Sequence, residues 1–120
     1  MISRQKQILA FFVLFFINII SAQQFLDEIE IVDISTEADV KSTIVRNPEQ
    51  ALLVVKTQVP GIRFQSNNII IKIEQVETGI YHLFVKPGTH RLVFQAAGFI
   101  SSKERFYFNP KDVKGVRIRV

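Results

Sequence analysis

The chain has 120 residues, a formal net charge of +4 and no cysteine. Without cysteine, no disulfide framework, thiolate metal site or cysteine nucleophile is available. Hydrophobic residues make up 48% of the sequence, which is enough for a single domain held together by apolar burial alone.

Residues 1–22 have the three-part pattern of a secretory signal peptide. Arg4 and Lys6 form a basic start, residues 8–20 are apolar apart from Asn18, and the small residues Ser21 and Ala22 follow. The alternatives are an uncleaved membrane anchor and a buried core helix, but this run is shorter than the roughly 20 residues that a spanning helix needs. We expect cleavage after Ala22 and export, in a bacterium, to the periplasm, the outer membrane or the medium.

Residues 23–48 are expected to form an acidic N-terminal strand and loop. Ile29 and Ile31 alternate with acids, which predicts an edge strand within residues 25–34. Residues 36–39, Thr-Glu-Ala-Asp, have the form of a helix capping box. Because Asn47-Pro48 follows within two turns, we expect only one helical turn or a loop here.

Residues 49–120 are expected to form the main domain. The continuous apolar run at 51–56, ALLVVK, predicts a strand that is buried on both faces. Further strands are predicted at 62–64, at 69–76 with Ile69, Ile71 and Ile73 facing one way, on both sides of Pro87-Gly88, at 103–108 and at 116–120.

Pro87-Gly88 predicts a β-hairpin between Gly79 and Phe99. The register that buries one face pairs Tyr81 with Phe94, Leu83 with Leu92 and Val85 with His90. The core face then consists of Tyr81, Leu83, Val85, His90, Leu92 and Phe94. The outer face consists of His82, Phe84, Lys86, Thr89, Arg91 and Val93.

No convincing long helix follows residue 22. About seven short strands separated by turn signals predict an all-β protein, because one sheet must bury its apolar face on another. We therefore expect an antiparallel β-sandwich.

Residues 86–94, KPGTHRLVF, are followed by Gly98-Phe99. This arrangement resembles the second half of a PEGA-type domain, in which a Pro-Gly turn, a basic-apolar strand and a Gly-aromatic pair occur in this order. The resemblance covers residues 80–120 well and residues 51–79 in part. It implies a prealbumin-like or immunoglobulin-like sandwich that serves as a non-catalytic module of exported bacterial proteins.

The sequence predicts no catalytic residue, metal site or cofactor. The two histidines, His82 and His90, fall on opposite faces of the predicted hairpin, so they cannot bind one metal ion together. We expect His90 to be a hydrogen-bonded histidine at the edge of the core. The glutamate pairs 28/30 and 74/77 are expected to be solvated, and the acids at 27–33 lack the pattern of a calcium loop.

The candidate binding surface is the outer face of the predicted hairpin. Phe84 and Arg91 are expected to lie opposite each other there, with Arg105 and Tyr107 nearby. An exposed aromatic beside basic side chains suits a protein partner or an anionic envelope glycan. The alternative is that a neighbouring strand or the N-terminal segment covers Phe84.

Charge is divided unevenly along the chain. Residues 23–50 hold seven acids and two bases, whereas residues 51–120 hold eleven bases and four acids. A nucleic-acid binder would have such a basic body, but here the bases alternate with apolar residues along strands, as on a solvated sheet face. We expect the acidic segment to lie along the basic sheet.

These features favour a non-enzymatic exported module that mediates protein–protein or cell-envelope interaction. Two alternatives remain open: the leading module of a larger exported protein or enzyme, and a small enzyme or inhibitor. The membrane is expected to be contacted only through residues 1–22 before cleavage.

Overall fold

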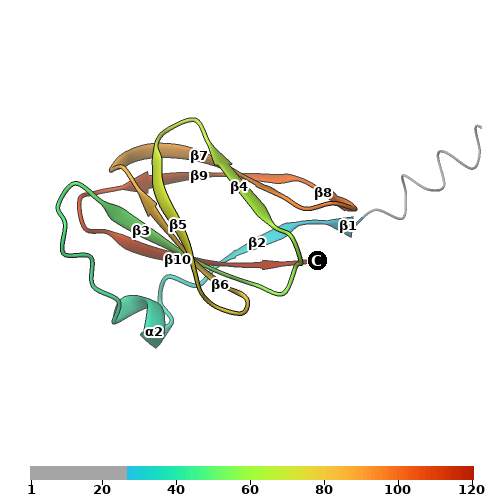
Figure 1. Ribbon diagram of the computed structural model, residues 1–120, viewed down its shortest axis with the longest axis horizontal. Helices are drawn as coiled ribbons and strands as arrows, with labels where there is room; N and C mark the ends of the chain where they lie inside the picture. The colour runs from blue at the N-terminus through green and yellow to red at the C-terminus, as the bar shows by residue number, and fades with distance from the viewer. Residues whose placement is uncertain (1–26) are drawn as a thin grey trace, which may run out of the picture.

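The computed structural model describes residues 27–120, which form an all-β sandwich (Figure 1). One sheet has five strands in the order β2-β10-β3-β6-β5, and the facing sheet has three in the order β4-β7-β9. The strands are β1 (Asp27–Glu28), β2 (Glu30–Asp33), β3 (Ala51–Thr57), β4 (Arg63–Ser66), β5 (Ile70–Glu77), β6 (Ile80–Val85), β7 (Gly88–Gln95), β8 (Phe99–Ile100), β9 (Ser102–Phe108) and β10 (Val113–Arg119), with one helical turn, α2 (Ala38–Lys41). The prediction of an all-β sandwich is confirmed, whereas the predicted signal peptide lies outside the described residues.

The sheets are not wholly antiparallel, and in this respect the prediction is wrong. β10 pairs in parallel with β3, from Val113 opposite Leu52 to Ile118 opposite Thr57. The two-residue strands β1 and β8 also pair in parallel. The sequence pattern identifies strands, but strand direction depends on the path of the loops between them, which the pattern does not record.

Strand β3 is central to the five-stranded sheet and buried on both faces, as the apolar run predicts. Every residue from Ala51 to Val55 is at most 4% exposed. Leu53 and Val55 face the three-stranded sheet and contribute to the main core. Leu52 and Val54 point to the opposite face, so that face also requires a cover.

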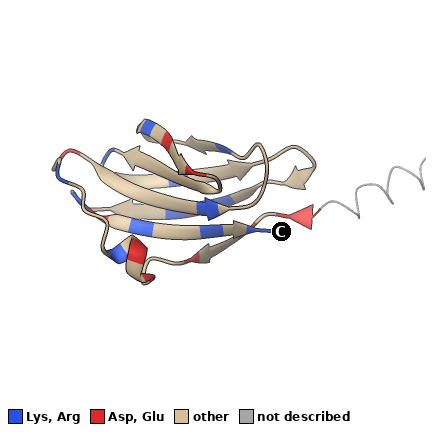
Figure 2. Ribbon diagram, turned by 60° about the horizontal axis from the view of Figure 1, so that its bottom comes forward, with Lys and Arg blue, Asp and Glu red and all other residues tan. Residues whose placement is uncertain are grey.

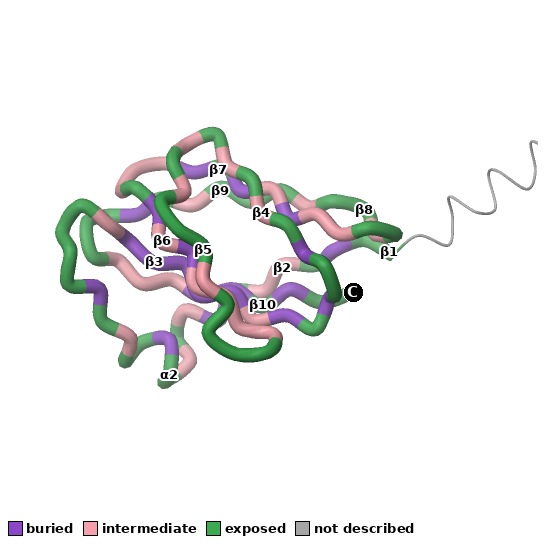
Figure 3. Tube along the Cα trace, in the orientation of Figure 1, coloured by how far each residue is buried: buried purple, intermediate pink, exposed green. Residues whose placement is uncertain are grey.

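The main core fills the space between the two sheets. Its largest side chains are Phe94 and Phe108 from the three-stranded sheet, packed with Leu53, Leu83 and other aliphatic residues of the five-stranded sheet. Phe64 of β4 makes edge-to-face contacts with Phe94 at 5.8 Å and with Tyr81 at 5.5 Å between ring centroids. Figure 3 shows the buried positions concentrated where the two sheets face each other.

The segment that contains α2 covers the outer face of the five-stranded sheet (Figure 1). Ile34, Val40 and Val45 pack there against Leu52 and Val54 and form a second, smaller core. The close approach is possible at Gly115 of β10, because a Cβ there would lie 3.0 Å from the Val40 methyl groups. Residues 27–48 are thus built into the sandwich through β2 and this cover.

The predicted hairpin between β6 and β7 is wrong. β6 pairs with β3 and β5, and β7 pairs with β4 and β9, so the chain crosses from one sheet to the other at Lys86-Pro87. The inward face is predicted correctly: Leu83 and Val85 meet Leu92 and Phe94 across the core rather than across a ladder. Period-two alternation selects the buried face of a strand but does not select its hydrogen-bonded neighbour.

The hairpin that does form joins β5 to β6 through Thr78-Gly79. The predicted alternation of Ile69, Ile71 and Ile73 is wrong because register shifts interrupt β5 between Ile70 and Lys72 and between Gln75 and Glu77. Each bulge inserts one residue and moves the following side chains to the other face. Ile70 therefore packs against the main core, while Ile71 is exposed.

The capping box at residues 36–39 is also wrong, although the single helical turn is present. The N-cap of α2 is Glu37, and its side chain makes no capping hydrogen bond. The Glu37 carboxylate instead forms ion pairs with Lys56 and Arg117 of the sheet, so it does not cap the helical turn.

We predict that Gly79→Ala costs about 3 kcal/mol of folding free energy, because positive φ and steric overlap act together. Gly79 has a φ of +79°, and a Cβ there would lie 2.7 Å from the carbonyl oxygen of Thr57. Gly98 is a matched control, because its φ is +85° and nothing lies within 4 Å of a Cβ. Gly98→Ala should cost only about 1 kcal/mol. Urea unfolding of both variants measures the difference, and equal losses would contradict the steric argument.

Candidate functional site

The outer face of the three-stranded sheet gathers basic side chains from all three strands. We call this surface the basic face; the strand registers place on it Arg63, Gln65, Thr89, Arg91, Val93, Gln95, Lys103, Arg105 and Tyr107. These positions alternate with the inward side chains of His90, Leu92, Phe94 and Phe108, which are all buried. Because these alternate side chains point into the core, the side chains of the basic face point away from it.

The four cations of the basic face are exposed, and no acid shares the face with them. Within residues 27–120, none of the four forms an ion pair. Arg91 lies directly opposite Arg105, a pairing of like charges that disfavours the sheet. The face therefore presents uncompensated positive potential to solvent, together with the Tyr107 ring, which is 60% exposed.

Three of the four residues predicted for a contact surface lie on the basic face: Arg91, Arg105 and Tyr107. Phe84 does not, and its predicted position opposite Arg91 is wrong, since β6 and β7 belong to different sheets. Phe84 packs against the second core under the α2 segment, and the Lys72 Nζ lies 5.5 Å from its ring centroid. This is the alternative in which the N-terminal segment covers Phe84.

The sequence reasoning missed Arg63 and Lys103 as members of the basic face. Arg63 lies between Ile62 and Phe64, and Lys103 lies two residues before Arg105, so each was available as an outward position. What the sequence did not provide was the pairing of β7 with β4 and β9, which brings the three strands together.

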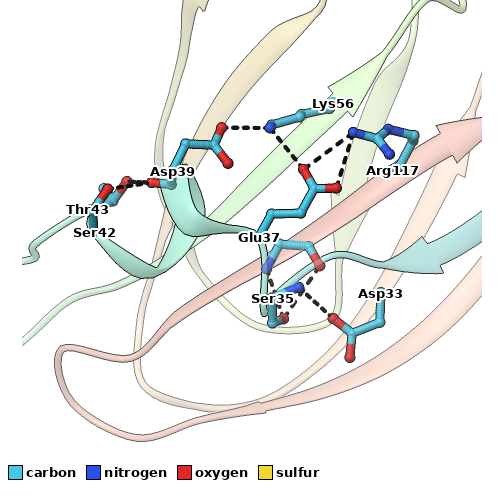
Figure 4. A network of polar contacts seen from close by, with 9 residues as sticks. Asp33, Ser35, Glu37, Asp39, Ser42, Thr43, Lys56 and Arg117 are labelled. Atoms are coloured by element: carbon cyan, nitrogen blue, oxygen red, sulfur yellow. Dashed lines mark hydrogen bonds and ion pairs between the residues drawn. The ribbon is translucent and has the colours of Figure 1, made fainter.

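Three cations of the five-stranded sheet, Lys56, Arg117 and Arg119, are in a different situation, because acids of the N-terminal segment pair with them. Figure 2 shows acids on α2 and β1 and bases spread over several strands. In Figure 4 the Lys56 Nζ contacts Glu37 at 3.1 Å and Asp39 at 2.5 Å, and Arg117 contacts Glu37 at 3.2 Å. The expectation that the acidic segment lies along the basic sheet is confirmed for these strands.

Ion pairing lowers the pKa of several carboxyl groups in this segment. The hydrogen bond and charge of Arg119 lower the pKa of Glu30, and the hydrogen bond from Lys56 lowers the pKa of Asp39. In return, Asp39 raises the pKa of Lys56. A hydrogen bond from Ser35 lowers the pKa of Asp33. Glu30, Asp39 and Lys56 fasten the N-terminal segment to the sheet, whereas the Asp33–Ser35 hydrogen bond lies within that segment.

His90 is fully buried and hydrogen-bonded at both ring nitrogens. Nε2 lies 2.6 Å from the carbonyl oxygen of Lys86, and Nδ1 lies 2.8 Å from the Ser66 hydroxyl. A carbonyl oxygen only accepts, so Nε2–H donates to Lys86, and Nδ1 forms its hydrogen bond with the Ser66 hydroxyl. The histidine thereby links the end of β4 to the point where the chain crosses between sheets, and the prediction of a hydrogen-bonded core histidine is confirmed.

His82 lies on the outer face of the five-stranded sheet, opposite Glu74 of β5. Burial lowers its pKa, and the charge of Glu74 opposes this effect. The two histidines belong to different sheets, so they do not form a common site.

Two concave regions lie away from the basic face. One, of about 570 Å³, is lined by residues 56–60, 78–79, Phe99 and the end of β10. Its three cations, Lys56, Arg117 and Arg119, are engaged by Glu37, Asp39 and Glu30. The other is lined by Glu28, Glu30 and Glu104 among other residues of β1, β2 and β9.

Within residues 27–120, no group of three or more histidine or acidic side chains is arranged to hold a metal ion. None of the helical structure in the same residues has the length and apolar character that crossing a bilayer requires.

No protein-family model matches the chain, and no curated protein or solved structure was found to be similar to it. The resemblance to PEGA-type domains therefore stays a prediction.

We predict that His90→Leu costs about 2 kcal/mol or more, because it leaves the Lys86 carbonyl and the Ser66 hydroxyl without their buried partner. The control is His82→Leu, on the outer face of the other sheet, which should change stability by about 0.5 kcal/mol or less. Thermal unfolding of both variants measures the difference. A loss in His82→Leu as large as in His90→Leu would contradict a specific role for the buried network.

We predict that the chain loses stability in acid and at high pH. The folded-state pKa values of Glu30 and Asp39 lie below their ordinary values of 4.5 and 3.8, so their contribution is complete above those values and is lost as the pH falls through the folded-state values. The folded-state pKa of Lys56 lies above its ordinary value of 10.5, so the contribution of Lys56 to stability is lost as the pH rises through the folded-state value. Unfolding midpoints recorded across pH should fall at both ends, and Glu30→Gln with Asp39→Asn should flatten the acidic limb. An unchanged acidic limb in that double variant would contradict the assignment.

Proposed function

We propose that this chain is a non-catalytic binding module, exported after cleavage behind Ala22, which binds an anionic glycan of the cell envelope through the basic face. One observation carries the proposal. Arg63, Arg91, Lys103 and Arg105 are exposed on one sheet face that has no acid, while the cations Lys56, Arg117 and Arg119 on the other sheet are paired.

The contrast between the two sheets supports a binding role. Exposed positive charge left unpaired on one face raises the local concentration of anions and steers them toward that face. Acids of the N-terminal segment pair with three cations of the five-stranded sheet, whereas no acid lies on the basic face. A polyanion with regularly spaced charges can contact several of these cations at once.

Tyr107 gives the basic face an apolar element beside the charges. Its ring is 60% exposed and lies opposite Thr89, next to the Arg91–Arg105 pair. A flat aromatic ring beside cations suits the apolar face of a sugar together with its acidic substituent. The resemblance of residues 80–120 to PEGA-type domains supports the same kind of role, a prealbumin-like or immunoglobulin-like module without catalytic residues.

The proposal predicts that the purified full chain binds polygalacturonate but not its fully methyl-esterified, neutral form. Arg91→Gln with Arg105→Gln should weaken binding about tenfold, because two exposed charge contacts are lost. Tyr107→Ala should weaken it further. Isothermal titration at low and at high salt measures both effects, and salt should reduce the affinity.

The matched control is Lys41→Gln with Arg46→Gln, which removes the same charge from exposed positions in the α2 segment and the loop that follows it. This variant should bind like the unmodified chain. Equal losses in the two double variants, or equal binding to the neutral polymer, would contradict the proposal. Polyglutamate is the third probe: binding to it in place of polygalacturonate would indicate an acidic protein partner instead.

A further inference from the structure

The edge strand β5 presents an unusual surface for a sheet edge. Only β6 pairs with it, so among the described strands its other side has no partner. Four aliphatic side chains on it or beside it are 45–56% exposed: Ile69, Ile71, Ile73 and Val76. Figure 3 shows this strand largely exposed. An exposed edge with aliphatic side chains is a template for pairing with another strand.

Two other edge strands, β9 and β2, are protected by charge. β9 has Lys103, Glu104 and Arg105 in succession, and β2 begins and ends with an acid. β5 also carries charges, at Lys72, Glu74 and Glu77, and it has two bulges, which disrupt the regular ladder at each end of the strand. The regular window between them is Lys72–Gln75. Any strand that joins this edge must therefore find its register within four residues.

Charge selects one register in that window. The Lys72 Nζ lies 2.6 Å from the Glu74 carboxylate, so both side chains lie on the same face of the sheet. A two-fold axis normal to the sheet leaves each side chain on its own face of the sheet. Residues opposite each other in an antiparallel pair share a face, so the pair must be centred on one residue that lies opposite its own copy. Centring on Lys72 or on Glu74 would oppose like charges, and centring on Gln75 would place Glu74 opposite Val76 and pair no charges. Centring on Ile73 places each Lys72 opposite a Glu74.

The same register covers exposed apolar surface. Ile73 pairs with Leu83 of β6, so its side chain lies on the core side of the sheet, at the rim of the sandwich. It is nevertheless 47% exposed. In a pair centred on this residue, the two Ile73 side chains contact each other and shield the rim of each core.

We propose that two copies of this chain associate through β5, antiparallel and centred on Ile73, so that their five-stranded sheets become continuous. Lys72 of each copy then pairs with Glu74 of the other. Because the regular window is short, we expect a weak dimer whose population depends on concentration. This surface is separate from the basic face, so dimerisation and anion binding can be tested independently.

Charge reversal tests the proposal in the purified full chain. Lys72→Glu and Glu74→Lys, each alone, oppose like charges across the axis and should raise the dimer dissociation constant about tenfold or more. The double variant restores the pairing and should dimerise like the unmodified chain. An equimolar mixture of the two single variants should form heterodimers, because the two acids of one variant then face the two bases of the other. Sedimentation equilibrium measures all four samples.

Ile44→Lys is the matched control, because Ile44 is 80% exposed but lies in the loop after α2. It should leave dimerisation unchanged. Circular dichroism melting checks that each variant folds. Hydrogen exchange of the unmodified chain gives a second readout, since the amides of residues 72–75 should gain protection as concentration rises. A chain that stays monomeric up to about 1 mM, or a dimer that neither single reversal weakens, would overturn the proposal.

Discussion

The burial of strand β3 on both faces is the constraint on which the rest of the structure depends. A run of five apolar residues in a strand points alternately to two sides, and neither side can be left in water without a large loss of hydrophobic free energy. The three-stranded sheet covers one side. A short helical segment covers the other, so the structure is a sandwich with an added third layer.

Much of the remaining architecture follows from this requirement. The α2 segment covers β3 only because Gly115 allows it to approach the sheet closely. It is fastened there by Glu37 and Asp39, whose charges meet Lys56 of β3 itself and Arg117 of β10. The acids of the N-terminal segment and the bases of β3 and β10 therefore form a single contact between the segment and the sheet. The cations of the three-stranded sheet have no such counterpart, which is why that sheet is the candidate for binding.

The sequence predicted the buried faces well and the strand neighbours poorly. Alternation showed that Leu83, Val85, Leu92 and Phe94 point inward, and the continuous run at β3 showed burial on both faces. It also suggested a hairpin at Pro87-Gly88, where the chain instead changes sheet. Both arrangements bury the same side chains, and the difference lies in hydrogen bonds that β6 already shares with β3 and β5. One partner, β5, is the strand just before β6, and the other, β3, comes from a more distant part of the chain, which local patterns do not report.

The candidate site was predictable to the same extent. Arg91, Arg105 and Tyr107 are outward positions of two strands that are close in the sequence, so their common face could be inferred. Phe84 was assigned to the wrong surface because the assumed hairpin placed it beside Arg91. Arg63 joins the face only through the pairing of β4 with β7. His90, by contrast, was identified from its position among inward residues, although its partners Ser66 and Lys86 were not foreseen.

The parallel pairing of β10 with β3 has a consequence for how the molecule acquires its structure. Residues 113–118 lie between β2 and β3 in the sheet, although both strands are far from these residues in the sequence. A ladder that joins such distant segments forms only after a costly loop closure, which slows folding. Until β10 is inserted, β2 and β3 remain unjoined, and the aliphatic run of β3 lies exposed as an aggregation-prone segment.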